Sequence, residues 1–163
     1  METKENIISV LVNNQPDVLA RIAGTFSGRG FNIESISANI TMNPDITRII
    51  ITTLGDQETV IKLEKQLHKI VDVLEVNDLT DVTSVQREMI LVRMNMAGLD
   101  QDRFMEMIDT HKWKVVSNAP DYCILEVTGG KREIEYALSI LKPMGLDDFT
   151  RTGTVAIERC KPQ

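Results

Sequence analysis

The sequence predicts an α+β fold that consists of two consecutive units, each with the element order βαββαβ. Three observations lead to this prediction. Apolar and polar residues alternate in several short segments, as half-buried strands require, and apolar residues recur at helical spacing in the segments between them. The same order of segments then occurs a second time along the 163 residues, a length that accommodates two small domains.

The first unit opens with a strand in which the even-numbered residues from 8 to 12 form one apolar face. Pro16 is expected at the first position of the following helix, where no hydrogen bond needs its missing N–H, and Gly28 is expected to end that helix. Turn residues at 43–45 join two β-branched strands, and Asp56 is expected to cap a second amphipathic helix. The expected strands are 7–14, 31–42, 47–54 and 73–79, and the expected helices are 16–27 and 57–70.

The second unit repeats this order after a polar stretch at 80–86, which we take as the boundary between domains 1–80 and 81–163. Asp147 and Asp148 are interpreted as a solvated turn. Two successive βαββαβ units correspond to two ferredoxin-like domains. The expected strands of the second unit are 89–97, 113–118, 122–128 and 150–158, and its expected helices are 102–111 and a segment around 134–141.

The composition argues against several classes of protein. The formal net charge is −6 and the basic residues are scattered, whereas a nucleic-acid surface needs clustered Lys and Arg. No apolar run approaches the ~20 residues of a membrane helix, and the first six residues lack the apolar core of a signal peptide. Cys123 and Cys160 stand alone, without metal-ligand spacing. We therefore expect a cytoplasmic protein with reduced thiols that binds neither nucleic acid nor membrane.

No combination of residues predicts catalysis or a metal site. His68 lies in a charged helix and His111 at the end of another, and both are expected on the surface without a general-base role. The glycines at 24–30 have neither dinucleotide-loop nor phosphate-loop spacing, so Gly24 is expected where the helix packs closely on its sheet. We expect no catalytic residue, no metal and no cofactor in this chain.

The loop at 13–18 has the chemistry of a small anion site. A helix N-terminus presents unpaired N–H groups and a partial positive charge, which suit a carboxylate. The side chain of Asn14 offers a donor and an acceptor to the polar end of an amino acid. Alternatively, Asn14 and Gln15 simply cap the helix, and the residues alone leave both interpretations open.

Several segments resemble the regulatory, or small, subunits of acetohydroxyacid synthase, which is also called acetolactate synthase. The resemblance runs through both predicted domains in order and is strongest in the N-terminal one. The segments that carry it are 8–14 (ISVLVNN), 18–24 (VLARIAG), 26–27 (FS), 29–36 (RGFNIESI), 64–73 (EKQLHKIVDV) and 87–92 (REMILV).

This resemblance implies that residues 1–80 form an ACT domain, which binds an amino-acid effector and pairs with the ACT domain of a second copy. It implies a non-catalytic regulatory subunit. Thiamine diphosphate, Mg²⁺ and FAD then belong to the large catalytic subunit, which acts in valine, leucine and isoleucine biosynthesis. The small subunit is expected to activate that partner and to mediate feedback inhibition by valine or a related branched-chain amino acid.

The resemblance also implies an effector site shared between two copies. One copy would contribute Asn14, Asp17 and Val18, and the other Asn32 and Ile33. The family normally has Gly at position 17, and two unit charges at ~4 Å repel by about 4 kcal/mol at an effective dielectric near 20. Asp17 is therefore expected to weaken valine inhibition. The alternative is that Asp17 points away from the effector and stabilises the first helical turn by ~0.3–1 kcal/mol.

A second hypothesis is a free-standing ACT-domain sensor that binds an amino acid and regulates another enzyme. The two hypotheses differ in what should copurify with the chain. Only the first requires a large thiamine-dependent subunit.

Overall fold

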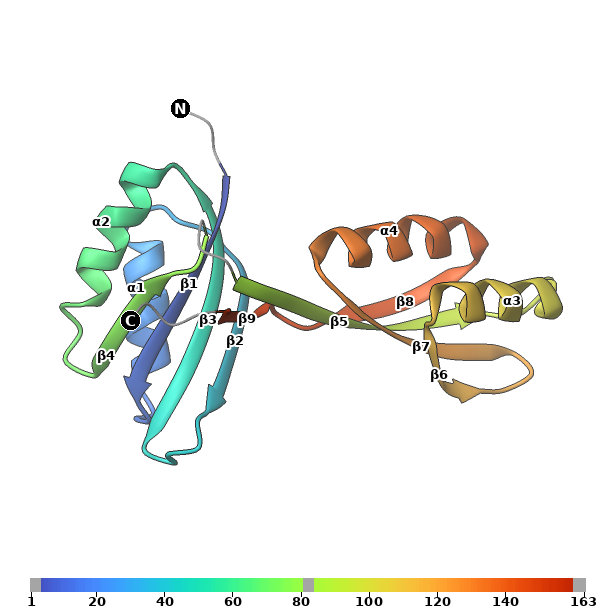
Figure 1. Ribbon diagram of the computed structural model, residues 1–163, viewed down its shortest axis with the longest axis horizontal. Coiled ribbons are helices and arrows are strands. Elements are labelled where there is room, and N and C mark those ends of the chain that lie inside the picture. Colours follow the sequence, from blue (N-terminus) through green and yellow to red (C-terminus); the bar gives the residue numbers. More distant parts are fainter. Residues whose placement is uncertain (1–3, 81–83, 160–163) are drawn as a thin grey trace. The chain divides into compact units, whose positions relative to one another are not determined.

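The computed structural model describes residues 4–80 and 84–159, so Cys160 and part of the predicted boundary stretch lie outside the described residues. The chain divides into two compact units, one formed by Met1–Val85 with Gly153–Gln163 and the other by Gln86–Thr152. Each unit is a sheet with two helices on one face (Figure 1). The predicted α+β class, with two βαββαβ units, is confirmed.

The first unit is an antiparallel sheet with the strand order β2-β3-β1-β4, so that β2 and β4 are its edges. Its elements in chain order are β1 (Lys4–Asn13), α1 (Val18–Ser27), β2 (Ile33–Ile40), β3 (Ile46–Gly55), α2 (Gln57–Leu67) and β4 (Val73–Asp78). Apolar side chains from one face of the sheet and from both helices meet in one core. Its buried members are Ile8, Val10, Val12, Val18, Ile22, Phe26, Ile49, Ile51, Val60, Leu63 and Leu67.

The helix starts of this unit confirm one prediction and correct another. Asp56 caps α2 as predicted, because its Oδ1 accepts a hydrogen bond of 2.8 Å from the backbone N–H of Thr59. The prediction that Pro16 opens α1 is wrong. The helix begins at Val18 with Asp17 as its N-cap, since the first helical bond runs from the Arg21 N–H to the Asp17 carbonyl.

The second unit is a sheet with the order β6-β7-β5-β8. Its elements are β5 (Ser84–Asn95), which begins in the first unit, α3 (Gln101–His111), β6 (Lys114–Asn118), β7 (Tyr122–Gly129), α4 (Lys131–Leu141), the 3-10 turn Lys142–Met144 and β8 (Leu146–Arg151). The buried core beneath α3 and α4 consists of Ile90, Val92, Met94, Met96, Phe104, Ile108, Cys123, Leu125, Val127, Ile134, Ala137 and Leu141.

The end of the chain differs from the prediction. A single closing strand over 150–158 is wrong, because the chain forms β8 and then, after a break, β9 (Val155–Glu158). The acidic pair interpreted as a turn lies within β8, where Asp147 accepts a hydrogen bond of 2.7 Å from Arg93 on β5. The division of the chain also differs from domains 1–80 and 81–163, since residues from Gly153 onward belong to the first unit.

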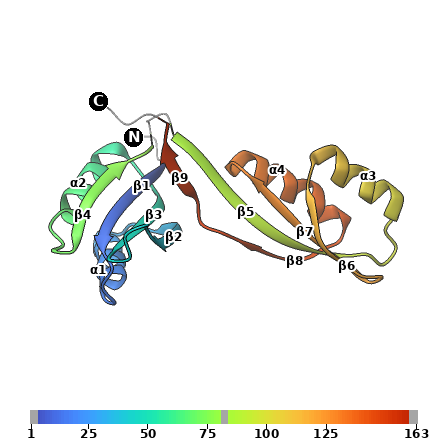
Figure 2. The same ribbon diagram turned by 60° about the horizontal axis from the view of Figure 1, so that its bottom comes forward.

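Strand β9 belongs to the first unit and pairs with β5 (Figure 2). Ile7 and Ile50 lie on the face of the first sheet that the helices leave open, because their chain neighbours Ile8 and Ile51 face the helical core. The returning chain covers part of this face. It completes a small buried apolar cluster whose members are Ile7, Ile50, Leu79 and Ala156.

Candidate functional site

A pocket of about 300 Å³ lies where the β1–α1 loop meets the ends of β2 and β3. Two of the predicted site residues, Asn14 and Val18, line it, whereas Asp17, Asn32 and Ile33 do not. The sequence did not single out the residues that the sheet contributes. These are Val12, Ala38, Asn39, Ile40, Thr47 and Ile49.

The side chain of Asn14 holds the loop against the β2–β3 turn. Its Nδ2 donates to the Pro44 carbonyl at 3.1 Å, and its Oδ1 accepts from the Thr47 hydroxyl at 3.2 Å. Its backbone N–H donates to the Asp45 carbonyl at 2.8 Å. Asn14 therefore does not cap α1, and its donor and acceptor are both engaged within the chain. It shapes the pocket by fixing the loop.

The N-terminus of α1 keeps free donors next to this loop. Within the described part of the chain, the backbone N–H groups of Leu19 and Ala20 have no hydrogen-bond acceptor. Asp17, the N-cap residue, makes no side-chain cap bond to them. These donors and the positive end of the helix leave room for an external carboxylate.

The side chain of Asp17 points to Arg21, which does not line the pocket. Its Oδ2 lies 3.1 Å from Arg21 Nε, an ion pair without hydrogen-bond geometry, and its side chain is 69% exposed. Arg21 also pairs with Asp72, whose other oxygen accepts from Asn13 Nδ2 at 3.3 Å. Arg21 first and then Asn13 hold the pKa of the Asp72 carboxyl below its usual range. The network ties α1 to the turn after α2 and holds the Asp17 carboxylate on the side of Arg21.

Asn32 and Ile33 lie at the other end of the sheet from the pocket. In the register, Ile33 is opposite Thr53, whereas Ile40, at the pocket, is opposite Thr47. The carbonyl of Asn32 accepts a hydrogen bond of 2.6 Å from the Thr53 hydroxyl. One chain alone therefore does not bring Asn32 and Asn14 together.

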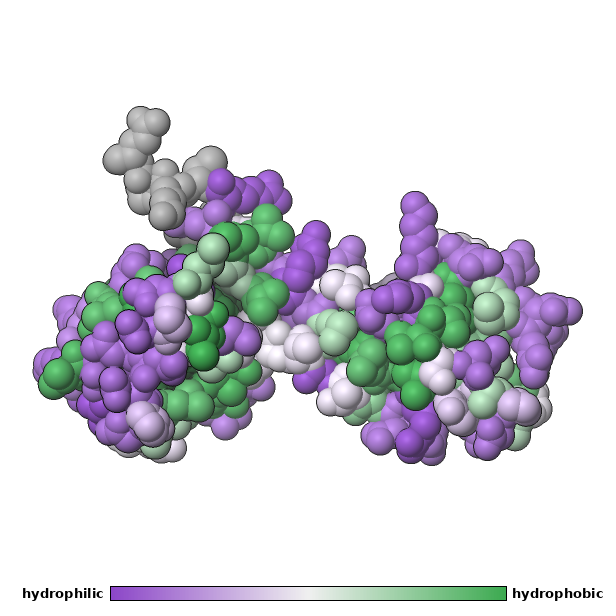
Figure 3. All heavy atoms as spheres, turned by 90° about the horizontal axis from the view of Figure 1, so that it is seen from below, coloured by the Kyte–Doolittle hydropathy of each residue, from purple (hydrophilic) through white to green (hydrophobic). Residues whose placement is uncertain are grey.

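Strand β2 exposes apolar side chains on the helical side of its sheet. Ile36 and Ala38 are opposite the core residues Ile51 and Ile49, yet Ile36 is 38% exposed and Ile40 60%. Figure 3 views the molecule from the end at which β1 leads into α1, and it shows apolar surface between the polar side chains there. An apolar edge strand of this kind is a surface for pairing with another chain.

The described residues contain no group of three or more His, Cys, Asp and Glu side chains placed to hold a metal ion. Cys123 is buried in the second core, and burial raises the pKa of its thiol. His68 is exposed at the end of α2, and the ring of His111 stacks on Trp113. None of the described helices is long and apolar enough to cross a membrane.

Both units of the chain match known protein families. Residues 8–75 match the family model described as an AHAS small subunit-like ACT domain, and residues 87–160 match that of the small subunit of acetolactate synthase.

Relatives match over nearly the whole chain. The acetolactate synthase small subunit of Aquifex aeolicus is 37% identical over 97% of this chain and 83% of its own length. A probable acetolactate synthase small subunit of Methanothermobacter thermautotrophicus is 35% identical over 98% of this chain and 95% of its own. The crystal structure of the small subunit from Thermotoga maritima superposes with a TM-score of 0.87 at 30% identity, covering 98% of this chain and 99% of that one.

Proposed function

Because the chain belongs to the family of acetolactate synthase small subunits, we propose that it binds the large catalytic subunit of that enzyme, raises its activity and makes it sensitive to a branched-chain amino acid. The observation that carries the effector part of this proposal is the pocket at the β1–α1 loop, which lies beside the exposed apolar side chains of the edge strand β2. Thiamine diphosphate, Mg²⁺ and FAD are assigned to the large subunit, and the complex to the cytoplasm.

A second copy completes this pocket in the proposed arrangement. If two β2 edges pair antiparallel, the start of one β2 lies beside the end of the other. The partner copy then contributes its residues 32–33 next to Ile40, which lines the pocket. The carboxylate of the effector would meet the free N–H groups of Leu19 and Ala20, and its apolar side chain would contact the pocket wall. Pairing at β2 also covers an open sheet edge.

The test of this function is an acetolactate assay with purified large subunit, measured with and without the chain across a range of valine concentrations. We expect no acetolactate from the chain alone, and faster formation when it is added to the large subunit. Valine should lower only the activity that depends on the chain. A chain that neither binds the large subunit nor changes its rate would favour the free-standing sensor instead.

The variant Asp17→Gly tests whether the carboxylate of Asp17 lies beside the effector. Since the Asp17 carboxylate is paired with Arg21 outside the pocket lining, we expect the unsubstituted chain to respond to valine. The inhibitory valine concentration should change by less than about twofold in the variant, because a surface ion pair contributes little free energy. Inhibition that appears only in Asp17→Gly, or sharpens more than about tenfold, would place the carboxylate beside the effector.

A further inference from the structure

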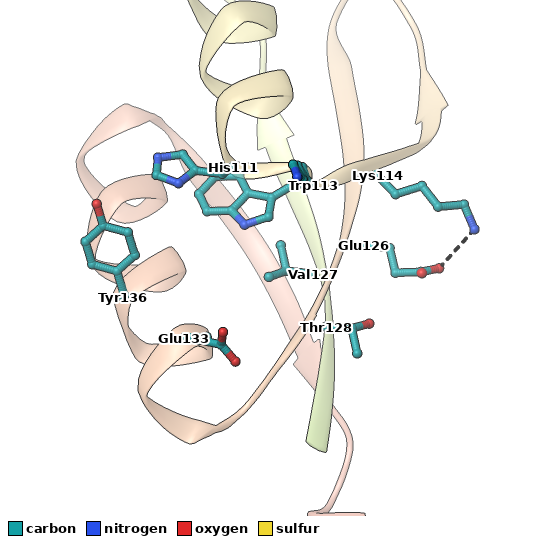
Figure 4. Close-up of a pocket in the computed structure, with 9 residues that line it drawn as sticks. His111, Trp113, Lys114, Glu126, Val127, Thr128, Glu133 and Tyr136 are labelled. Carbon is teal, nitrogen blue, oxygen red and sulfur yellow. Dashed lines mark ion pairs between the residues drawn. The ribbon is translucent and has the colours of Figure 1, made fainter. Parts of the chain in front are cut away.

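A second pocket, of about 310 Å³, lies in the second unit, between the end of α3, the start of β6 and the first half of α4. Figure 4 shows the side chains of Trp113, Val127, Glu133 and Tyr136 around it, with Trp113 and Glu133 on opposite sides. The volume is at the lower end of the range for ligand sites, which favours a small molecule. The proposed activity uses nothing in this pocket.

The aromatic part of the pocket wall consists of His111, Trp113 and Tyr136 (Figure 4). The ring of His111 stacks on Trp113 with centroids 4.7 Å apart and meets Tyr136 edge to face at 5.7 Å. Val127 adds a buried aliphatic surface. Because His111 contacts both of the other rings, the rings present apolar area without a large loss of side-chain freedom on binding.

The carboxylate of Glu133 is fixed at the opposite side by its backbone surroundings. Its Oε2 accepts a hydrogen bond of 2.6 Å from the Gly130 N–H in a capping box. A side chain at Gly129 would collide with this carboxylate, since a Cβ there would lie 2.8 Å from the Oε2 of Glu133. A carboxylate can accept several hydrogen bonds, so Glu133 retains capacity for a donor in the pocket.

The rim formed by residues 112–114 provides positive charge and hydrogen-bond donors, in contrast to the carboxylate of Glu133. Lys112 lines the pocket, and among the described residues its ammonium group has no carboxylate partner. Lys114, by contrast, is paired with Glu126 at 3.6 Å. The indole N–H of Trp113, which points into the pocket in Figure 4, likewise has no acceptor within the described part of the chain.

We propose that this pocket binds a small zwitterion, an α-amino acid with an apolar side chain. Its ammonium group would contact Glu133, its carboxylate would contact Lys112 and the indole N–H of Trp113, and its side chain would contact Val127 and the ring of Tyr136. A simple cation is less suitable, because Lys112 opposes it, and a simple anion is opposed by Glu133. This site is separate from the pocket at the β1–α1 loop and does not depend on the function proposed above.

Trp113 reports on this pocket directly, because it is the only tryptophan in the chain. We would titrate the full chain with three probes of similar shape and follow its fluorescence: L-leucine as the zwitterion, leucinamide as the cation and 4-methylpentanoate as the anion. We expect L-leucine to give a saturable change and to bind at least about tenfold more tightly than the other two, since each lacks one charged contact.

Three variants assign the charges. Glu133→Gln, which can keep the capping box, should weaken L-leucine about tenfold or more. Lys112→Gln should weaken the binding of L-leucine by about 2–5-fold, because an exposed ion pair contributes little free energy. Glu135→Gln, on the same helix but outside the pocket lining, is the matched control and should have no effect.

The outcomes against the proposal are equally distinct. Tighter binding of leucinamide, together with a gain of affinity in Lys112→Gln, would make this a cation site. A fluorescence change that disappears in Asn32→Ala would come from the first unit. No saturable change with L-leucine, with a response only on addition of the large subunit, would make the aromatic surface a protein interface. None of these results bears on whether the chain activates the large subunit.

Discussion

Ile36→Asp is expected to separate the proposed dimer, weakening self-association by at least about 100-fold and removing the response to valine. Ile36 lies near the middle of β2, so a two-fold axis between antiparallel β2 edges would bring both substituted side chains close together. Burying two unpaired like charges opposes association. The side chain is already 38% exposed in the single chain, so the fold itself should tolerate the change.

The matched control is Leu74→Asp, because Leu74 is a half-exposed apolar residue on β4, the other edge of the same sheet. Sedimentation gives the oligomeric state of both variants, circular dichroism checks their fold, and calorimetry gives valine binding. Loss of the dimer in Leu74→Asp but not in Ile36→Asp would move the pairing to β4. The pocket beside β2 would then lack the partner residues proposed to complete it.

The pattern of the sequence predicts the elements well because they depend on local periodicity and end chemistry. The stripe that ends at Phe26 and the cap at Asp56 are set by residues within one helix. The end of the chain could not be predicted in this way, because β8 and β9 are defined by long-range pairing. Taken alone, Asp147 is typical of a turn. Only the folded sheet brings Arg93, which is far away in sequence, close enough to donate a hydrogen bond to it.

The sequence predicts a small-molecule site at the loop between β1 and α1, and a pocket lies at this loop, but its use as a binding site stays a prediction and the contacts of its side chains could not be predicted. A helix N-terminus after a strand is a local signal, and the pocket does lie there. Whether Asn14 faces a ligand or the β2–β3 turn depends on Pro44 and Thr47, which only the folded sheet brings near. The direction of Asp17 likewise depends on Arg21, whose own position is fixed from the turn after α2.

The local sequence likewise did not predict which glycine lies at a close contact. Gly24 was expected where α1 packs closely on its sheet, yet a Cβ at Gly24 would meet no atom within 4 Å. In the first unit, a close approach to the backbone of the sheet occurs at Gly153 instead. A Cβ there would lie 2.6 Å from the carbonyl oxygen of Ile36 and 3.1 Å from the backbone nitrogen of Ser37. Backbone atoms in a paired strand cannot move aside as the end of a flexible side chain can.

Gly153→Val is therefore expected to lower the free energy of unfolding of the first unit by about 1–3 kcal/mol, the usual result of forcing extra volume into a packed site. The added side chain must displace either β2 or the segment that carries Thr154 and Ala156, both of which are buried. Native-state hydrogen exchange of the first unit measures the loss. Gly24→Ala is the control, and it should keep or raise stability, because Ala exceeds Gly in helix propensity by ~1 kcal/mol and meets open space. Equal protection in Gly153→Val and the unsubstituted chain would show that β9 is not held against the sheet. Lost protection confined to β9 would show that the terminal segment moves away and leaves β2 unchanged.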